Sequence, residues 1–184
     1  MIKAVIFDFD GVLADSFNNL YRLNALAFHR VGLPFREADY RRLFIGNIHK
    51  QLKKLIRDEG KRQACLDIKK RYFSDYYRRV QLFPFFELLV RWLAKRFGLA
   101  VVSSTLDAYF KAILGSGPEC KAEKVRIAMA AMNSTPGRTV FITDTVGDIQ
   151  VGKRLGLRTL AVSWGFHDEE LLRKKSLTGI FNNY

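Results

Sequence analysis

Two carboxylates, Asp8 and Asp10, follow the first apolar run of the sequence and are separated by one residue. This run, residues 2–7, is short and rich in β-branched side chains, which predicts a strand buried on both faces. If the strand continues through Phe9, both carboxylates leave it on the same side, where they repel each other unless a cation or a shared proton neutralises them. Gly11 then permits a sharp turn. Taken alone, the pattern also fits a buried strand that ends in a polar turn.

Polar side chains also follow two later apolar runs, residues 99–102 and 139–143. They are Ser103 and Ser104 after the first run, and Asp144 and Asp148 after the second, while Lys121 begins a predicted helix nearby. The carboxyl ends of parallel strands meet at one edge of a sheet, so these side chains are expected to converge. A carboxylate can attack phosphorus, and Mg²⁺ and a lysine can neutralise the charge of that attack. The set therefore predicts phosphoryl transfer, with Mg²⁺ bound by aspartates.

The order of apolar runs predicts an α/β fold. Four predicted strands, 2–7, 99–102, 139–143 and 158–163, alternate with predicted helices, which is typical of a Rossmann-like, doubly wound parallel sheet. Residues 179–181 could add a short edge strand. Helical spacing of apolar residues also predicts eight helices, at 16–31, 36–44, 50–57, 61–80, 87–97, 107–114, 121–132 and 148–155. The first four of them form a helical insertion after the first strand.

Length and composition limit the class of protein. The 184 residues, of which 48% are hydrophobic, suffice for one domain with an insertion, and no stretch approaches a membrane span. The start of the chain carries no signal-peptide pattern, so we expect a cytoplasmic protein. Cys65 and Cys120 are far apart, which argues against a disulfide framework or a zinc site. The sequence does not predict an oligomeric state.

The basic charge is concentrated in the insertion. Residues 16–82 hold 16 Lys and Arg against 6 Asp and Glu, a net charge of +10 out of +13 for the whole chain. Such asymmetry favours an anionic substrate or partner near this segment. Solvated helix faces explain the same excess, and we rank that explanation above nucleic-acid binding.

Four motifs in order resemble those of the haloacid dehalogenase (HAD) superfamily of hydrolases. Asp8-Phe9-Asp10-Gly11-Val12 is similar to the first motif, and residues 100–104 to the second, a strand that ends in Ser or Thr. Lys121 resembles the lysine of the third motif, and residues 144–148 the acidic fourth motif. The resemblance extends to the phosphoglycolate phosphatase-like branch with a small helical cap. It implies a catalytic core of residues 1–15 and 83–184 and a cap of residues 16–82.

The resemblance also implies roles for the residues that bind and transfer the phosphoryl group. Asp8 would be the nucleophile, and Asp10 the general acid and base. Ser103 and the amide of Ser104 would hold the phosphoryl group, and Lys121 would offset its charge.

A second set of roles concerns the metal. Mg²⁺ would be bound by Asp8, by the backbone carbonyl of Asp10 and by Asp144. Asp148 would support the metal through water or orient Lys121. An acid two residues after the nucleophile favours phosphoryl chemistry over dehalogenation within this superfamily.

Two regions depart from the pattern or leave it open. Lys121 is followed by Ala-Glu-Lys instead of Pro-x-Pro and lies fewer residues after Ser103 than usual, so Lys124 is a rival for the lysine role. In the cap, Gly46 and Asn47 are expected to contact substrate. Further candidates there are Arg41, Arg42, His49 and Lys50.

We therefore expect a Mg²⁺-dependent phosphatase that acts on a small phosphorylated metabolite through an aspartyl-phosphate at Asp8. A phosphomutase of the same superfamily is the first alternative, because it shares the motifs. A basic nucleic-acid-binding protein on the same fold is the second. The physiological phosphomonoester is not predicted.

Overall fold

The structure, a computed structural model, describes residues 1–103, 120–175 and 179–182. The chain forms two compact units. Unit 1 comprises residues 1–14 and 82–184, and unit 2 comprises residues 15–81.

Unit 1 is built on a five-stranded sheet with the order β4-β1-β5-β6-β7. All of its strand pairs are parallel. Its strands are β1 (Ala4–Phe7), β4 (Gly98–Val101), β5 (Thr139–Thr143), β6 (Arg158–Val162) and β7 (Gly179–Phe181). The predicted parallel α/β sheet is confirmed, including the short edge strand β7.

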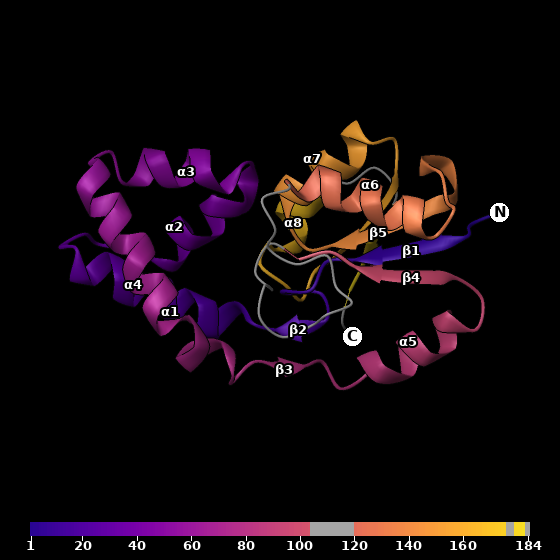
Figure 1. Ribbon diagram of the computed structural model, residues 1–184, viewed down its shortest axis with the longest axis horizontal. Helices are drawn as coiled ribbons and strands as arrows, with labels where there is room; N and C mark the ends of the chain where they lie inside the picture. Colours follow the sequence, from indigo (N-terminus) through magenta and orange to yellow (C-terminus); the bar gives the residue numbers. More distant parts are fainter. Residues whose placement is uncertain (104–119, 176–178, 183–184) are drawn as a thin grey trace. The chain divides into compact units, whose positions relative to one another are not determined.

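Helices cover both faces of this sheet (Figure 1). The helices of unit 1 are α5 (Phe86–Ala94), α6 (Lys121–Ala131), α7 (Val146–Arg154) and α8 (Glu169–Arg173). α6 and α7 lie on one face and α5 on the other. The predicted helix at 107–114 lies outside the described residues, and the short α8, which Asp168 caps, was not predicted.

The two faces of β1 belong to two different packing layers. Ile6 is fully buried in an apolar cluster with Val125 and Ala128 of α6. Phe7, the next residue, packs its ring against Phe86 of α5, with the ring centroids 5.6 Å apart. Because side chains alternate along a strand, Asp8 follows the parity of Ile6 and faces α6. The alternation of side chains along β1 therefore decides on which face of the sheet Asp8 lies.

Unit 2 is helical, with an aromatic core. It contains α1 (Phe17–Arg30), α2 (Glu37–Arg42), a 3₁₀ turn (Leu43–Ile45), α3 (Ile48–Leu55) and α4 (Glu59–Tyr77). Tyr40 is buried at its centre, and its ring contacts those of Phe17, Tyr21, Phe35 and Phe44. α3 and α4 begin two residues before their predicted starts, because Asn47 and Asp58 cap them.

Two very short strands, β2 (Ala14–Asp15) and β3 (Gln81–Leu82), form a separate two-stranded sheet. Neither was predicted, since two residues carry no periodic signal. The helices of the described residues are too short or too polar to span a membrane. Both cysteines are free, Cys65 buried and Cys120 exposed.

Candidate active site

Asp8 lies at the carboxyl end of β1, in the middle of the sheet. Its N–H still donates to the carbonyl of Ile142 at 2.9 Å, so the pairing with β5 extends to this residue. One carboxylate oxygen, Oδ1, accepts the N–H of Phe9 at 2.8 Å. Asp8 is buried. Its side chain is therefore held in one orientation at the edge where the parallel strands end.

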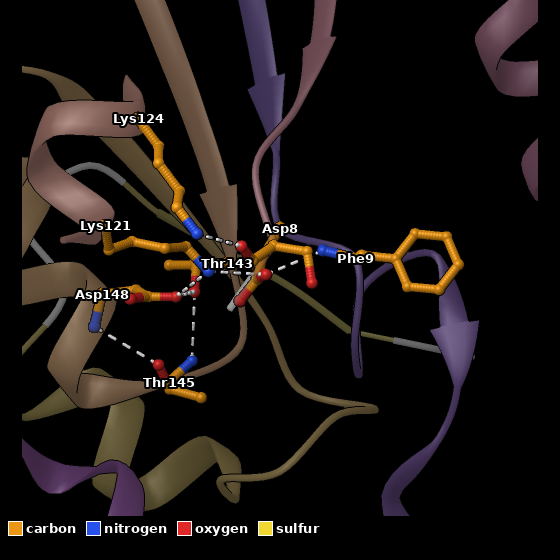
Figure 2. A network of polar contacts seen from close by, with 8 residues as sticks. Asp8, Phe9, Lys121, Lys124, Thr143, Thr145 and Asp148 are labelled. Carbon is orange, nitrogen blue, oxygen red and sulfur yellow. Dashed lines mark hydrogen bonds and ion pairs between the residues drawn. The ribbon is translucent and has the colours of Figure 1, made fainter. Parts of the chain in front are cut away.

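Lys121 lies between two buried carboxylates (Figure 2). Its Nζ is 2.7 Å from Oδ1 of Asp8 and 3.0 Å from Oδ2 of Asp148. The three side chains come from β1, α6 and α7, and each is at most 15% exposed. The fold thus brings a nucleophile candidate into contact with a cation 113 residues away in sequence.

The charges of this triad set the direction of each pKa. Burial raises the pKa of the Asp8 carboxyl well above its ordinary value, against the opposing effect of the Lys121 ammonium. For Asp148 burial acts in the same direction, but the Lys121 ammonium and a hydrogen bond to Asp8 hold its pKa below the ordinary value. Burial lowers the pKa of Lys121, but the two carboxylates outweigh it and the net shift is upward. Lys121 therefore pairs with both carboxylates, and Asp8, whose pKa stays raised, is the one that gains most from an added cation.

Asp148 sits in the first turn of α7. The predicted start of this helix at Asp148 is wrong, because Thr145 is the N-cap and its hydroxyl accepts the N–H of Asp148 at 3.3 Å. The hydroxyl of Thr143, the last residue of β5, donates to Oδ2 of Asp148 at 3.3 Å. Sequence reasoning missed both threonines, although threonine immediately before a helix is an N-cap signal.

Asp144 is fully buried between two backbone segments. Its Oδ2 accepts the N–H of Phe166 at 2.7 Å, whereas its Oδ1 has no hydrogen-bond partner. A Cβ at Gly11 or at Gly165 would collide with this carboxylate, so only glycine fits at either position. Burial raises the pKa of Asp144 to about 7, although the Phe166 N–H opposes the shift.

This donor set fits a divalent cation. Among the described residues, no group of three His, Cys, Asp or Glu side chains is arranged to hold a metal ion. Asp144 nevertheless presents a buried carboxylate oxygen without a hydrogen-bond donor, which is costly unless a cation or a proton satisfies it. Mg²⁺ needs few side-chain ligands, because waters and carbonyl oxygens complete its shell. Asp8 and Asp144, which are close enough for the charge of Asp144 to raise the pKa of Asp8, are the carboxylates that could hold it together with a backbone carbonyl.

Asp10 belongs to the turn that follows β1. The strand does not continue through Phe9, so the condition under which both carboxylates would leave it on one side is not met. β1 ends at Phe7, and the carbonyl of Phe9 accepts three N–H groups of the turn, from Val12, Leu13 and Ala14. Asp10 is 9% exposed. This turn therefore sets the position of Asp10, and the alternation of side chains along a strand does not.

Ser103 follows β4 and is fully buried. Its carbonyl accepts a hydrogen bond from Nζ of Lys124 at 3.1 Å. The two candidate lysines thus have different partners: Lys121 contacts Asp8, and Lys124 contacts the backbone of Ser103. Ser104 lies outside the described residues.

The remaining candidates belong to unit 2. The side chain of Asn47 caps α3 by accepting the N–H of Lys50 at 3.0 Å, and Gly46 directly precedes it. Arg41 pairs with Glu37 at 2.7 Å. The other candidates in this unit, Arg42, His49 and Lys50, are exposed.

His167 is a buried polar residue that sequence reasoning did not single out. It is 1% exposed, and its Nδ1 accepts the N–H of Val146 at 3.0 Å, which ties the loop after β6 to the start of α7. A histidine between Phe166 and Asp168 gives no periodic signal, so only the three-dimensional contact identifies it.

Comparisons with known proteins agree with this geometry. Residues 2–156 match the model of the haloacid dehalogenase-like hydrolase family. A phosphoglycolate phosphatase of Synechococcus elongatus is 25% identical over 93% of this chain and 88% of its own length. Another, of Aquifex aeolicus, is 24% identical over 100% of this chain and 98% of its own length. The solved structure of a haloacid dehalogenase-like hydrolase from Streptococcus pneumoniae covers 100% of this chain and 94% of its own with a TM-score of 0.83 at 22% identity, and so supports the fold.

Proposed function

Because the chain belongs to the haloacid dehalogenase-like hydrolase family, we propose that it hydrolyses a small phosphomonoester through an aspartyl-phosphate formed on Asp8. The observation that carries this proposal is the contact of the Lys121 ammonium with the buried Asp8 carboxylate at 2.7 Å. Two relatives that share nearly the full length of the chain are phosphoglycolate phosphatases, which favours a small phosphorylated substrate.

In the first half of the reaction, a carboxylate oxygen of Asp8 attacks phosphorus and the bond to the leaving oxygen breaks. Both reactants are anions, so their approach needs positive charge at the site. Lys121 provides one such charge. Asp148 contacts the Lys121 ammonium, and the hydroxyl of Thr143 donates to Asp148. We assign Asp148 to orienting Lys121, since its Oδ2 contacts this ammonium at 3.0 Å. Ser103, at the end of the neighbouring strand, is assigned to the phosphoryl group.

Asp10 is assigned to proton transfer. It gives a proton to the leaving oxygen in the first half. In the second half it takes a proton from the water that attacks phosphorus, while the bond between phosphorus and the Asp8 oxygen breaks and inorganic phosphate leaves. The turn that follows β1 holds Asp10 two residues from the nucleophile.

Asp8, Asp144 and the backbone carbonyl of Asp10 would hold Mg²⁺, which supplies charge neutralisation to the phosphoryl group when bound. The unpartnered Oδ1 of Asp144 supports this assignment. Unit 2 is proposed as a cap that selects substrate, with Gly46 and Asn47 as contacts.

The test is hydrolysis of p-nitrophenyl phosphate, and then of a panel of small phosphomonoesters, with Mg²⁺ and with EDTA. We expect Mg²⁺-dependent release of inorganic phosphate that falls by at least about a thousandfold in Asp8→Asn. A requirement for a bisphosphate activator would point to a phosphomutase instead. No turnover of any substrate in the panel would refute the proposal.

A further inference from the structure

Lys124 is a second buried lysine beside the catalytic one, and the reaction described above does not use it. It is 4% exposed, and its Nζ donates to the Ser103 carbonyl at 3.1 Å. Figure 2 shows Lys121 and Lys124 reaching from the same helix toward the end of the sheet. Residues three apart share a helix face, so both ammonium groups reach the same edge.

Stability alone does not explain a lysine at this position. The following residues of the same helix that face inward, Val125, Ala128 and Met129, belong to an apolar cluster. A buried ammonium has lost its hydration and needs hydrogen-bond partners, and a cation in the first turn of a helix also opposes the helix dipole.

The hydrogen bond of Lys124 acts on the backbone that carries Ser103. On the preceding residue, the Val102 N–H donates to the Phe7 carbonyl at 2.8 Å, which joins this end of the chain segment to β1. Lys124 binds the carbonyl of Ser103, one residue further along the chain. The end of the segment is thus held from two sides.

We propose that Lys124 is a positioning residue for phosphoryl binding: it holds the backbone at Ser103 and brings a second positive charge to the end of the sheet. This inference rests on the proposed function, in which Ser103 binds the phosphoryl group. Lys124 donates to the carbonyl of Ser103, whereas Lys121 contacts the nucleophile, so we expect the effect of Lys124 to fall on binding of the phosphoryl group more than on the chemical step.

The experiment compares Lys124→Met, which removes both charge and donor, with Lys124→Arg, which keeps both. Lys153→Met, at an exposed position of α7, is the matched control for loss of one lysine. Binding of inorganic phosphate is measured by titration calorimetry in the presence of Mg²⁺, beside kcat and KM for p-nitrophenyl phosphate and the melting temperature.

For Lys124→Met we expect phosphate affinity to fall and KM to rise by about tenfold, with a smaller change in kcat. Lys124→Arg should recover part of the affinity, and Lys153→Met should match the native chain. A folded Lys124→Met with native phosphate affinity and KM would overturn the inference. So would a lower melting temperature as its only change, or an equal loss in Lys124→Arg.

The two proposals fail in different ways. A native chain that hydrolyses phosphomonoesters while Lys124→Met binds phosphate normally refutes the positioning role alone. A native chain that neither hydrolyses phosphomonoesters nor binds phosphate refutes both.

Discussion

The buried site of unit 1 and the surface of unit 2 use charged residues in opposite ways. In unit 1, Lys121 is 10% exposed and lies between the buried carboxylates of Asp8 and Asp148. In unit 2, Arg42 is 68% exposed and lies 3.7 Å from Asp39 on the same helix. The first arrangement joins residues far apart in sequence, while the second is a local pair one helical turn apart.

The difference between the two arrangements lies in solvation. Surface pairs remain hydrated, so each contributes little to stability. Buried carboxylates have lost their water and depend on the few cations and donors around them. The basic excess of unit 2 lies mostly on exposed side chains, whereas the three charges around Asp8 in unit 1 are buried and mutually dependent. Three substitutions test this contrast.

The largest effect is expected for Lys121→Met. Removing the ammonium leaves Asp8 and Asp148 buried without their cation, which should lower the free energy of unfolding by about 3–5 kcal/mol. Turnover should fall by about a hundredfold or more, because charge on the attacking carboxylate and on the phosphoryl group is no longer offset. Urea unfolding and phosphatase assays measure the two effects. A free energy of unfolding within about 1 kcal/mol of the native value would show that the buried Asp8 and Asp148 do not depend on the Lys121 ammonium.

The next effect concerns pH and Asp144. Its pKa of about 7 in the folded chain is above the ordinary 3.8, so the folded state holds this proton more tightly than the unfolded state does. The resulting stability is complete below about pH 4 and is lost as pH rises through about 7. Without metal, the native chain should therefore lose on the order of 3–4 kcal/mol from this group between these limits.

Asp144→Asn removes this contribution, so its metal-free stability should fall less steeply between pH 5 and pH 8.5. Mg²⁺ should stabilise the native chain at pH 8.5 and stabilise the variant less. Thermal unfolding at both pH values, with Mg²⁺ and with EDTA, gives the comparison. Identical pH slopes for the two chains would contradict the interpretation.

The smallest effect is expected for Arg42→Ala in unit 2. The pair with Asp39 is exposed and local, so the free energy of unfolding should change by no more than about 0.5 kcal/mol. Urea unfolding of Arg42→Ala and of Lys121→Met under the same conditions compares the two losses in the free energy of unfolding. A loss as large as that of Lys121→Met would remove the distinction between the two units.

The parts of the fold that depend on periodicity could be predicted from the sequence. The apolar runs at 2–7 and 139–143 predicted β1 and β5, and the polar residues that follow them were expected at one edge of the sheet, where Asp8 and Asp144 are found. Alternation along β1 also explains why Asp8 faces α6. The same logic failed at Asp10, because the chain had already left the strand for a turn.

Other features depend on contacts between distant segments and left no sequence signal. Lys121 and Lys124 lie on one helix face, so spacing alone could not separate them, while the structure gives each a different partner. The enclosure of Asp144 by Gly11, Gly165 and the Phe166 N–H joins residues from both ends of unit 1. No local pattern reports such a contact.

The central place of β1 in the sheet also has a consequence for synthesis on the ribosome. Among the described residues β1 pairs with β4 and β5, which begin at Gly98 and Thr139, so this strand is without a neighbour while the residues up to β4 are still being translated. At about 5–20 residues per second, this wait lasts on the order of 5–20 s for β4 alone. During this time an apolar strand with two unpaired edges is open to other nascent chains. The helices of unit 2 contact each other locally and emerge during the same interval, so the order of translation favours folding of unit 2 before the sheet.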